Sequence, residues 1–585
     1  MHLIRTLALT GCFLASPAAP LLTPVPAVAA DAVVADAQLP FQFDRNVMVP
    51  MKDGVRLATH VYRPRGEGRY PVILLRTPYG KPDQNWGEIK RYLPAGYALV
   101  AQDCRGRGQS EGTWNPFFLD REDGLETQAW LGKQPWCNGD IGTSGGSYGG
   151  WTQWASAPGA TPHLKCMVPV VPFAEVYEDI AYPGGAFQLA LLLGWGASVA
   201  GVNLPPDKLA EAYRHLPLST LGDQFERKIG YLNDWATHPT PDEYWQRRGI
   251  GPTHAAVTVP VLNIGGWYDI FSKTTLDLTD RVREGSTNRA MRRNQTVVMG
   301  PWAHGVGARK VGELDFGDEA VAPIGDWQFN WFEFWLKGRD TKVENWPAYR
   351  LFVMGENRWR NEHEWPLERT RFTPLYLRSG GRANSLRGDG ALTFDLPPAE
   401  GTDTFVYDGD RPVPTLGGNN LVGAAAGPMD QTSVEQRDDV LVYTTEPLTQ
   451  PVEVTGPVKA ILFAASSAPD TDFTAKLVDV HPDGRAFNLC DGIQRARWRN
   501  SRTQPEPLTP GKVERFEIDL WVTSNLFQPG HRLRVEISSS NFPRFDRNAN
   551  SGKPHGTDTE LLEATQTVRH GGAFASHLLL PIIPR

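Results

Sequence analysis

The sequence predicts an α/β domain that is interrupted by a helical insertion and followed by an all-β domain. Over residues 40–172, short and nearly continuous apolar runs alternate with a helical pattern, which is typical of buried strands in a mostly parallel sheet. Residues 173–255 show helical patterns separated by Pro and Gly, and the strand–helix alternation resumes over 256–345. From 346 to 585, strand-like runs follow one another between turns.

Particular runs carry the α/β prediction. Before the insertion, strands are expected over 56–64, 70–80, 97–103, 140–146 and 165–171, with a helix over 120–134. After it, strands are expected over 259–266 and 295–301, and a helix over 327–338 ends at Gly338, a plausible C-terminal cap. Because ligands of such sheets bind at the carboxyl ends of the strands, the active site is expected there.

The insertion and the all-β domain are predicted in the same way. Helices of the insertion are expected over 172–181, 187–195, 206–216 and 241–249. Strands of the all-β domain are expected over 349–355, 373–381, 440–448, 452–466, 473–484, 513–525, 531–540 and 576–583. Their spacing suits a sandwich of the jelly-roll type.

The first 30 residues are predicted to be an export signal peptide. His2 and Arg5 supply positive charge, residues 6–16 are apolar, and small residues precede a cleavage site after Ala29 or Ala30. The mature protein is therefore expected to be secreted or periplasmic.

The cysteines point to no metal site or disulfide framework. Cys12 ends a short sequence that resembles a lipoprotein cleavage box, but the apolar stretch before it is short, so lipid anchoring is the less favoured alternative. The others have no metal-ligand spacing and are expected to be buried thiols, with disulfides as the alternative: Cys104, Cys137, Cys166 and Cys490.

Composition excludes some partners. The formal net charge is -7 and there is no long basic run, which argues against nucleic acid. No segment after the signal approaches the ~20 apolar residues that a membrane-spanning helix needs. The sequence is compatible with a homo-oligomer.

The G-x-S-x-G pattern of serine hydrolases occurs twice, in overlapping registers around Ser144 and Ser147. A nucleophile at this motif sits between a buried strand and a helix that starts immediately after it. Ser144 leaves only a few strand residues before it and would start its helix in Gly-Gly-Ser. Ser147 follows a possible strand and precedes a helical run, while Gly145 and Gly149 occupy the positions where strand and helix pass closely. Ser147 is therefore the predicted nucleophile, with Ser144 as a small strand residue.

A base and an orienting acid must assist the serine, and in this fold the acid comes before the histidine. Asp269 follows the strand predicted at 259–266, and His304 follows the strand predicted at 295–301. Taken singly, Asp269 fits a turn or helix-capping carboxylate and His304 a surface-loop imidazole. Together with Ser147 they have the type, order and position of a catalytic triad.

The oxyanion of an acyl-transfer reaction needs two hydrogen-bond donors. The backbone N–H of Tyr148, directly after the nucleophile, is the first. The second is expected from the loop after the strand at 70–80, where the Tyr79 phenol is a candidate and a packed loop aromatic is the alternative.

Five motifs, in this order, resemble the cocaine-esterase and X-prolyl dipeptidyl-peptidase family: RTPYGK, QDCRGRGQSEG, GGSYGG, GGWYDIF and MGPWAHG. The resemblance runs from about residue 45 to the C-terminus. It implies an α/β-hydrolase domain with an inserted helical cap and a C-terminal jelly roll. It also implies Ser147 as nucleophile, Asp269 as acid, His304 as base, and Tyr79 with Tyr148 as the oxyanion hole. Asp103 and Arg105 look like scaffold contacts beside the site.

The resemblance leaves the substrate open. Trp151, Trp154, Trp267 and Phe271 flank the catalytic motifs and suggest an apolar acyl pocket, with core packing as the alternative. Carboxylates at 175, 178 and 179 resemble an ammonium site, but a solvated helix face is favoured.

The predicted function is a secreted serine hydrolase that cleaves esters or amides of bulky, largely apolar acyl groups. An X-prolyl dipeptidyl-peptidase acting on short peptides and an α-amino-acid ester hydrolase or acylase are the alternatives. A carbohydrate-binding or surface protein with an inactive hydrolase domain is the alternative outside enzymes. The chemistry needs no metal ion and no organic cofactor.

Overall fold

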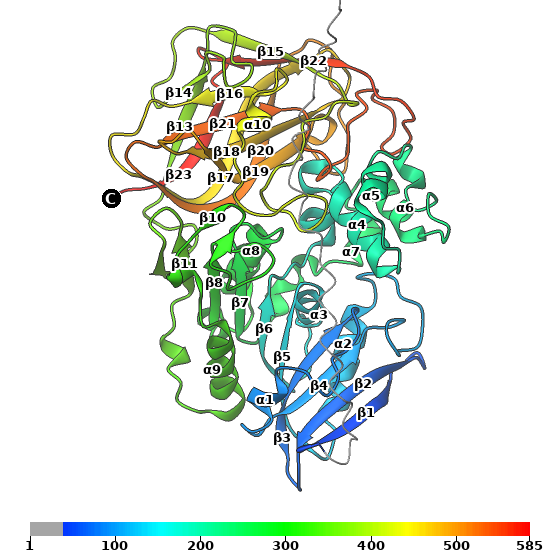
Figure 1. Ribbon diagram of the computed structural model, residues 1–585. Coiled ribbons are helices and arrows are strands. Elements are labelled where there is room, and N and C mark those ends of the chain that lie inside the picture. The colour runs from blue at the N-terminus through cyan, green and yellow to red at the C-terminus, as the bar shows by residue number, and fades with distance from the viewer. Residues whose placement is uncertain (1–38) are drawn as a thin grey trace, which may run out of the picture.

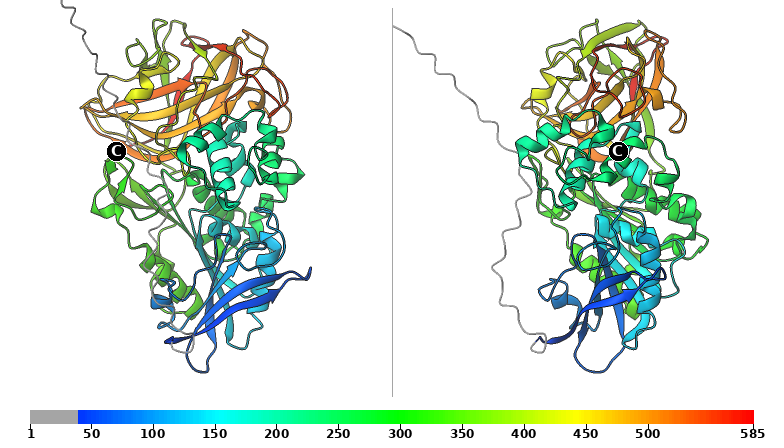
Figure 2. Two further views of the ribbon diagram at one scale, coloured as in Figure 1. Left: turned by 45° about the vertical axis from the view of Figure 1, so that its right-hand side comes forward. Right: turned by 90° about the vertical axis from the view of Figure 1, so that its right-hand side faces the viewer.

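A computed structural model describes residues 39–585. The predicted signal peptide and Cys12 lie outside these residues. Figure 1 shows three parts: a sheet with flanking helices in blue to green, a group of helices in cyan and teal, and a strand-rich domain in yellow to red. Figure 2 shows that the strand-rich domain covers one end of both other parts.

The first part is built on a ten-stranded sheet in the order β1-β2-β4-β3-β5-β6-β7-β8-β11-β12. The strands from β4 to β11 along this order are parallel, and β1, β2 and β12 are antiparallel to their neighbours. Their bounds are Phe41–Pro50 (β1), Arg56–Pro64 (β2), Tyr70–Thr77 (β3), Ala98–Asp103 (β4), Cys137–Gly146 (β5), Leu164–Val170 (β6), Val261–Gly266 (β7), Gln295–Gly300 (β8), Tyr349–Val353 (β11) and Arg358–Glu362 (β12). The central strands are almost wholly buried, which explains their continuous apolar runs.

Helices cover both faces of this sheet. They are α1 (Ile89–Tyr92), α2 (Asp120–Leu131), α3 (Tyr148–Ser156), α8 (Ser272–Gly285) and α9 (Ile324–Lys337). A Cβ on Gly142 would lie 2.7 Å from Phe332 of α9, whereas one on Gly145 would lie 3.1 Å from the Gly149 oxygen of α3. Because strand residues three apart face opposite sides, α9 and α3 pack on opposite faces of β5. Gly338 ends α9 in the left-handed conformation, as predicted.

The insertion between β6 and β7 is helical, as predicted. Its longer helices are α4 (Leu189–Val199), α5 (Pro206–Tyr213), α6 (Gly230–Thr237) and α7 (Glu243–Gln246). Short 3₁₀ turns occupy Pro183–Gly185, Leu218–Thr220 and Gly251–Ala256, and a π-helical turn occupies Val176–Ala181.

The C-terminal domain is rich in β-structure. Its strands are β13 (Arg371–Arg378), β14 (Ala391–Thr393), β15 (Gly401–Tyr407), β16 (Leu441–Thr444), β17 (Val452–Ser466), β18 (Asp472–Val480), β19 (Ala486–Arg495), β20 (Glu514–Phe527), β21 (Arg532–Ser538), β22 (Ala564–His570) and β23 (His577–Ile583). One short helix, α10 (Thr432–Glu435), precedes β16, and β9 (Lys310–Val311) with β10 (Leu314–Asp315) forms a small hairpin elsewhere. The predicted α/β-hydrolase fold with a cap and a C-terminal β-rich domain is thus confirmed, while its description as a jelly roll stays a prediction.

One predicted boundary is wrong. The sequence predicts residues 349–355 as part of the all-β domain, but β11 pairs parallel with β8 and β12 pairs antiparallel with β11. The first sheet therefore extends beyond the boundary predicted between 345 and 346. An isolated strand pattern does not indicate which sheet the strand joins.

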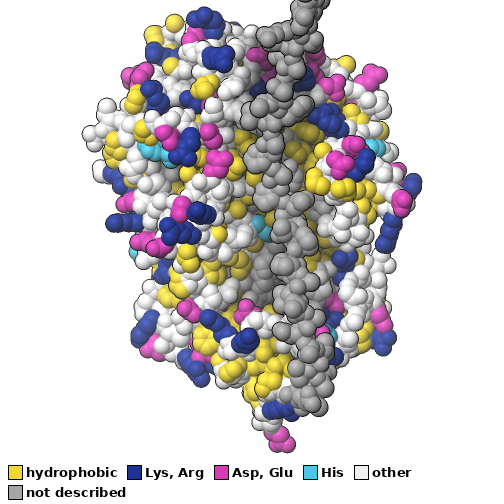
Figure 3. Space-filling model, in the orientation of Figure 1, with side chains coloured by type: hydrophobic (Ala, Val, Ile, Leu, Met, Phe, Trp, Pro, Cys, Tyr) yellow, Lys and Arg dark blue, Asp and Glu magenta, His cyan; other side chains and the backbone are white. Residues whose placement is uncertain are grey.

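The distribution of surface charge and the state of the cysteines agree with what the sequence predicts. Figure 3 shows basic and acidic side chains interspersed over one face. Within residues 39–585, no helix is long and apolar enough to cross a membrane. The four cysteines of this range are buried free thiols, as expected.

Candidate active site

Ser147 occupies a strained turn between β5 and α3. Its backbone has φ 57° and ψ -120°, a conformation that an L-residue rarely adopts. The Ser147 N–H donates to the Val170 carbonyl at 2.9 Å, and the Ser147 carbonyl accepts from Gly150 and Trp151 in α3. Such strain persists where the surrounding structure enforces it, and it is the backbone geometry of a nucleophile elbow. Ser144 lies within β5, paired with Val168.

The glycines around this turn are not equally constrained. Gly145 has φ 140°, and a Cβ there would lie 2.8 Å from Leu75 and 3.1 Å from the Gly149 oxygen. A Cβ on Gly149 would meet Leu75 at 3.4 Å and the Arg76 oxygen at 3.6 Å, which are ordinary contacts. A Cβ on Gly150 would lie 3.1 Å from the Val170 oxygen. The close approach predicted for Gly149 is therefore found at Gly145 and Gly150.

Asp269 and His304 form a hydrogen-bonded pair. His304 Nδ1 donates to Asp269 Oδ2 at 2.6 Å, and the other Asp269 oxygen accepts the Phe271 N–H at 2.8 Å. The Asp269 side chain is fully buried and that of His304 is 17% exposed. Because a carboxylate only accepts, this bond places the imidazole proton on Nδ1 and leaves the Nε2 lone pair available as a base.

The sheet brings this pair to the edge that carries Ser147. Strand registers align Gly146 of β5 with Val170 of β6, Val170 with Ile264 of β7, and Gly266 with Gly300 of β8. The carboxyl ends of these strands are therefore level, and the three predicted residues follow them, as in other open α/β sheets.

Tyr79 projects into the same region from the loop after β3. Its hydroxyl oxygen accepts a hydrogen bond from the Trp195 indole of the cap at 3.1 Å. Because the oxygen is the acceptor, the Tyr79 O–H proton remains free to donate elsewhere. Desolvation raises the pKa of Tyr79, and the neighbouring Trp195 and Ser147 side chains partly oppose this. The phenol therefore stays protonated as a donor.

Buried polar groups anchor Tyr148, the residue after Ser147. As the first residue of α3, Tyr148 has a backbone N–H without an acceptor in the helix. Its phenol donates to Asp120 Oδ2 at 2.6 Å and accepts the Phe117 N–H at 2.8 Å. Asp120 also accepts the Trp151 indole N–H at 3.1 Å. These contacts fix the residue whose amide is the predicted oxyanion donor.

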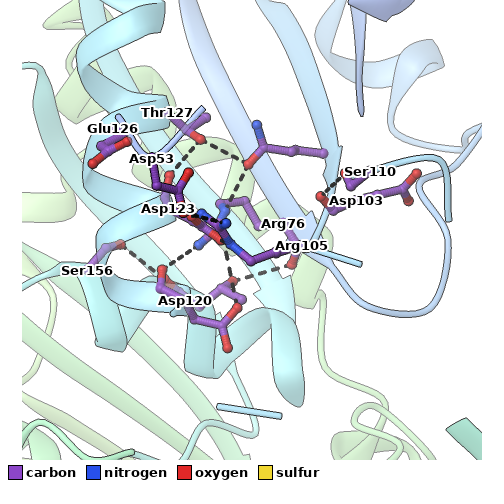
Figure 4. A network of polar contacts seen from close by, with 12 residues as sticks. Asp53, Arg76, Asp103, Arg105, Ser110, Asp120, Asp123, Glu126, Thr127 and Ser156 are labelled. Carbon is purple, nitrogen blue, oxygen red and sulfur yellow. Dashed lines mark hydrogen bonds and ion pairs between the residues drawn. The ribbon is translucent and has the colours of Figure 1, made fainter. Parts of the chain in front are cut away.

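Figure 4 shows the network beneath this anchor. Arg76 reaches from β3 to donate to the Asp120 carbonyl at 2.7 Å, and its guanidinium lies 4.0 Å from the carboxylates of Asp120 and Asp123. Arg105 is held between Asp123 at 2.6 Å and Asp53 at 2.7 Å. Arg105 is thus a scaffold residue, as expected.

Asp103, the other expected scaffold residue, fixes the loop that carries Tyr79. It accepts from the Lys81 backbone N–H at 2.7 Å and from Lys81 Nζ at 2.6 Å. Both side chains are almost fully buried. Because separating this buried pair would leave a charge without its partner, the contact holds the loop in place.

A small pocket opens beside the serine and draws on all three parts of the molecule. Its lining consists of Tyr79, Phe117, Ser147, Tyr148, Phe173, Ile180, Leu191, Trp195, Ile270, Phe271 and Leu421. None of these residues carries a charge. Tyr79 is 53% exposed, which places it at the mouth. The cavity measures about 20 Å³, space for about one water molecule.

Of the four predicted substrate-binding residues, Phe271 lines this pocket and also packs on the His304 ring at 5.8 Å. The three tryptophans do not reach it. Trp151 stacks on Phe173 one layer behind the lining. Trp154 and Trp267 are fully buried; their indoles donate to Asn263 and to the Phe352 carbonyl. For these tryptophans the structure shows the alternative, core packing.

The carboxylates of the cap face a different cavity, about 610 Å³ in volume, between the cap, α8 and the β-rich domain. Asp179 accepts the N–H groups of Ala174 and Glu175 and so closes its own turn. Glu175 and Glu178 lie 3.9 Å and 3.5 Å from arginines of α8 and the β-rich domain. Burial, together with Asp179, raises the pKa of Glu175 to about 7. These groups form a cross-domain ionic cluster rather than a simple solvated helix face.

Sequence reasoning missed several residues that complete the site. Trp195 is hydrogen-bonded to Tyr79, and Asp120 is hydrogen-bonded to Tyr148. Asn419 is hydrogen-bonded to the turn that carries Asp269. The Asn419 amide donates to the carbonyls of Trp267 and Asp269 at 2.9 and 2.7 Å. No local pattern marks them, because each acts on a partner distant in the sequence.

The fold and this arrangement define the class of the protein: it is a serine hydrolase. A family model of the X-Pro dipeptidyl-peptidase (S15 family) matches residues 53–306, and that of the X-Pro dipeptidyl-peptidase C-terminal non-catalytic domain matches 341–579. The chain is 40% identical to cocaine esterase of Rhodococcus sp. (strain MB1 Bresler), over 92% of this chain and 98% of that enzyme.

Two solved structures extend the similarity. An aminopeptidase from the marine sediment archaeon Thaumarchaeota archaeon superposes with a TM-score of 0.82 at 27% identity, covering 95% of this chain and 99% of the other. An α-amino acid ester hydrolase superposes with a TM-score of 0.78 at 26% identity, covering 97% and 100%. The chain belongs to the cocaine-esterase and X-prolyl dipeptidyl-peptidase (S15) family.

Proposed function

We propose that this serine hydrolase cleaves carboxylic esters with an uncharged, largely apolar acyl group, through an acyl-enzyme on Ser147. The observation that carries the proposal is the uncharged, largely aromatic pocket that contains Ser147, next to the Asp269–His304 pair. His304 Nε2 takes the Ser147 proton as the hydroxyl attacks the ester carbonyl. Asp269 stabilises the resulting imidazolium, and His304 then activates the water that releases the acid.

The oxyanion of each tetrahedral intermediate is assigned to two donors. The backbone N–H of Tyr148 lies at the start of α3, where helix-terminal amides favour negative charge. The Tyr79 hydroxyl supplies the second bond, since the Trp195 indole occupies its oxygen and leaves its proton free. Desolvation of this region strengthens both interactions in the transition state.

The lining favours esters over substrates with a free α-amino group. An ammonium next to the reacting carbonyl needs a carboxylate partner when it is desolvated. Among the residues that line the pocket there is none, and Glu175, Glu178 and Asp179 line a different cavity. X-prolyl dipeptidyl-peptidase and amino-acid ester hydrolase activities are therefore the less favoured candidates.

The pocket must widen for a bulky acyl group. A volume of about 20 Å³ holds far less than an aromatic ring. Leu191 and Trp195, both on α4 of the cap, form part of its wall. We infer that these cap side chains move outward as the substrate enters.

A comparison of two chromogenic substrates tests the proposal. p-Nitrophenyl butyrate presents an apolar acyl group, and Gly-Pro p-nitroanilide presents an X-Pro dipeptide with a free ammonium. We expect the ester to have the higher kcat/KM by at least 100-fold, and Ser147→Ala to abolish its turnover in a protein with an unchanged circular dichroism spectrum. A preference for the dipeptide amide would reject the ester assignment, and undiminished turnover by the variant would reject the nucleophile.

Export is a separate part of the proposal and rests on residues 1–30 of the sequence. N-terminal sequencing of the mature protein is expected to find Ala30 or Asp31 first. Recovery of the protein from the cytoplasmic fraction with its first residues still attached would contradict export.

A further inference from the structure

Two histidines and an aspartate meet at a corner of the β-rich domain, on strands that contribute nothing to the pocket. They are Asp479 at the end of β18, His481 just after it and His531 just before β21. We propose that these three side chains bind a divalent transition-metal ion of the zinc type. The site lies outside the pocket that contains Ser147, and its existence is independent of the ester hydrolysis proposed above.

Strand register brings the three side chains to one face. β18 and β21 are antiparallel, and their last paired positions are Val480 and Arg532. One residue further, His481 and His531 stand opposite each other, and Asp479 precedes His481 by two residues. Side chains two apart on a strand, and those directly opposite across a pair, point to the same side. The fold therefore presents three potential ligands on one surface.

The distances suit a shared ion. His531 Nδ1 lies 2.8 Å from Asp479 Oδ1, and His481 Nε2 lies 3.9 Å from Asp479 Oδ2. The two imidazole rings have centroids 4.5 Å apart, and one potential ligand atom from each residue lies within 4.8 Å of the others. Ligands of a tetrahedral zinc stand about 3.4 Å apart, given zinc–nitrogen bonds near 2.0–2.1 Å. Side-chain rotations that move individual ligand atoms by up to about 1.4 Å would bring the three to this spacing.

Burial and neighbouring groups support the same conclusion. The Asp479 side chain is 7% exposed, and those of His531 and His481 are 16% and 25% exposed, so the ion would be shielded but reachable from solvent. Asn525 donates from its amide to Asp479 Oδ2 at 3.4 Å and helps orient the carboxylate. Two imidazoles and one carboxylate are a zinc ligand set that leaves a tetrahedral position for water.

A simple ion pair explains less of this geometry. The Asp479–His531 bond alone would tie β18 to β21. That bond does not explain why the His481 imidazole also lies beside the Asp479 carboxylate, close to the ring of His531. Two cations lie nearby in sequence, and each has a carboxylate partner: Arg485 is paired with Asp483 at 2.8 Å and Arg532 with Glu446 at 3.7 Å, so their charges are partly balanced at this corner. A bound dication would link the turn after β18 to the start of β21.

Zinc titration of the full-length, untagged protein tests the proposal. After removal of metal with EDTA and exchange into clean buffer at pH 7.5, ZnCl2 is added while heat is measured by isothermal titration calorimetry. We expect one zinc ion per chain. His481→Ala and His531→Ala should each weaken binding at least ten-fold, and the double variant should remove it. His363→Ala, which deletes an exposed histidine outside the site, is the matched control and should bind as the wild type does.

Thermal unfolding gives a second measurement. Zinc should raise the midpoint of the wild type and of His363→Ala, and leave the double variant unchanged, because only ligand bound to the folded state stabilises it. His481 makes the longer contact with Asp479, so His481→Ala keeps the test valid even where loss of His531 impairs folding. Absence of zinc binding in the wild type, or equal affinity in the double variant, would overturn the proposal.

Discussion

At the residue scale, the proposed chemistry depends on donors and acceptors that are fixed before substrate arrives. Asp269 and His304 were predictable because each follows a buried strand, and strand ends converge in a parallel sheet. Trp195 was not predictable, since it bonds a tyrosine 116 residues earlier in the chain, from a cap helix whose docking no local pattern encodes. The same holds for Asp120 beneath Tyr148.

The role of Tyr79 is tested by Tyr79→Phe, which keeps the ring and removes the hydroxyl. We expect kcat for p-nitrophenyl butyrate to fall about 100- to 1,000-fold with little change in KM, as for loss of one oxyanion donor. Trp195→Phe removes the indole donor that orients Tyr79 and should lower kcat less, by about ten-fold. An unchanged kcat in Tyr79→Phe would show that the phenol is not part of the oxyanion hole.

At the element scale, the apolar runs and turn residues predicted most strands and helices of the α/β domain. The helix α6 was missed because it is short and its residues, GYLNDWAT, mix polar and apolar types without clear periodicity. Strand β11 was predicted as a strand but assigned to the wrong domain, because its pairing with β8 is a long-range contact. The position of the turn between β5 and α3 was predicted correctly. Which of its glycines has no room for a Cβ depends on side chains and backbone atoms that only the folded structure places beside it.

Two glycine substitutions test which glycine beside Ser147 is too closely packed to accept a Cβ. Gly145→Ala adds a methyl group at φ 140° against Leu75 and the Gly149 backbone, so we expect at least ten-fold less ester turnover and a lower unfolding temperature. Gly149→Ala adds its methyl group at ordinary contact distances within α3 and should change stability by no more than about 1 kcal/mol. Turnover and thermal unfolding of both variants give the comparison. Equal effects of the two would contradict the packing described for the elbow.

At the scale of the whole molecule, the β-rich domain takes part in the active site. Leu421 lines the pocket, and Asn419 of the same loop holds the turn that presents Asp269. Tyr268 donates to the Asn488 carbonyl of β19, a further link between the two domains. None of these three contacts could be predicted from sequence, since domain docking depends on surfaces that exist only after both domains have folded.

Asn419→Ala tests this link. It leaves the carbonyls of Trp267 and Asp269 without the amide, and we expect a loss of about 1–3 kcal/mol in the free energy of unfolding. We also expect kcat to fall in Asn419→Ala, because the turn that carries Asp269 is then held by fewer hydrogen bonds. Asn361→Ala, on the exposed side of β12, is the control and should leave both quantities unchanged. Wild-type turnover and stability in Asn419→Ala would show that the β-rich domain does not support the site.

The central claim is that Ser147 is the nucleophile, and fluorophosphonate labelling tests it most directly. The reagent is added to the wild type, Ser147→Ala and Ser144→Ala, and tandem mass spectrometry localises the adduct, since both serines fall on one tryptic peptide. The account predicts a single adduct on Ser147 in the wild type and in Ser144→Ala, and none in Ser147→Ala. An adduct on Ser144, or undiminished labelling of Ser147→Ala, would contradict it.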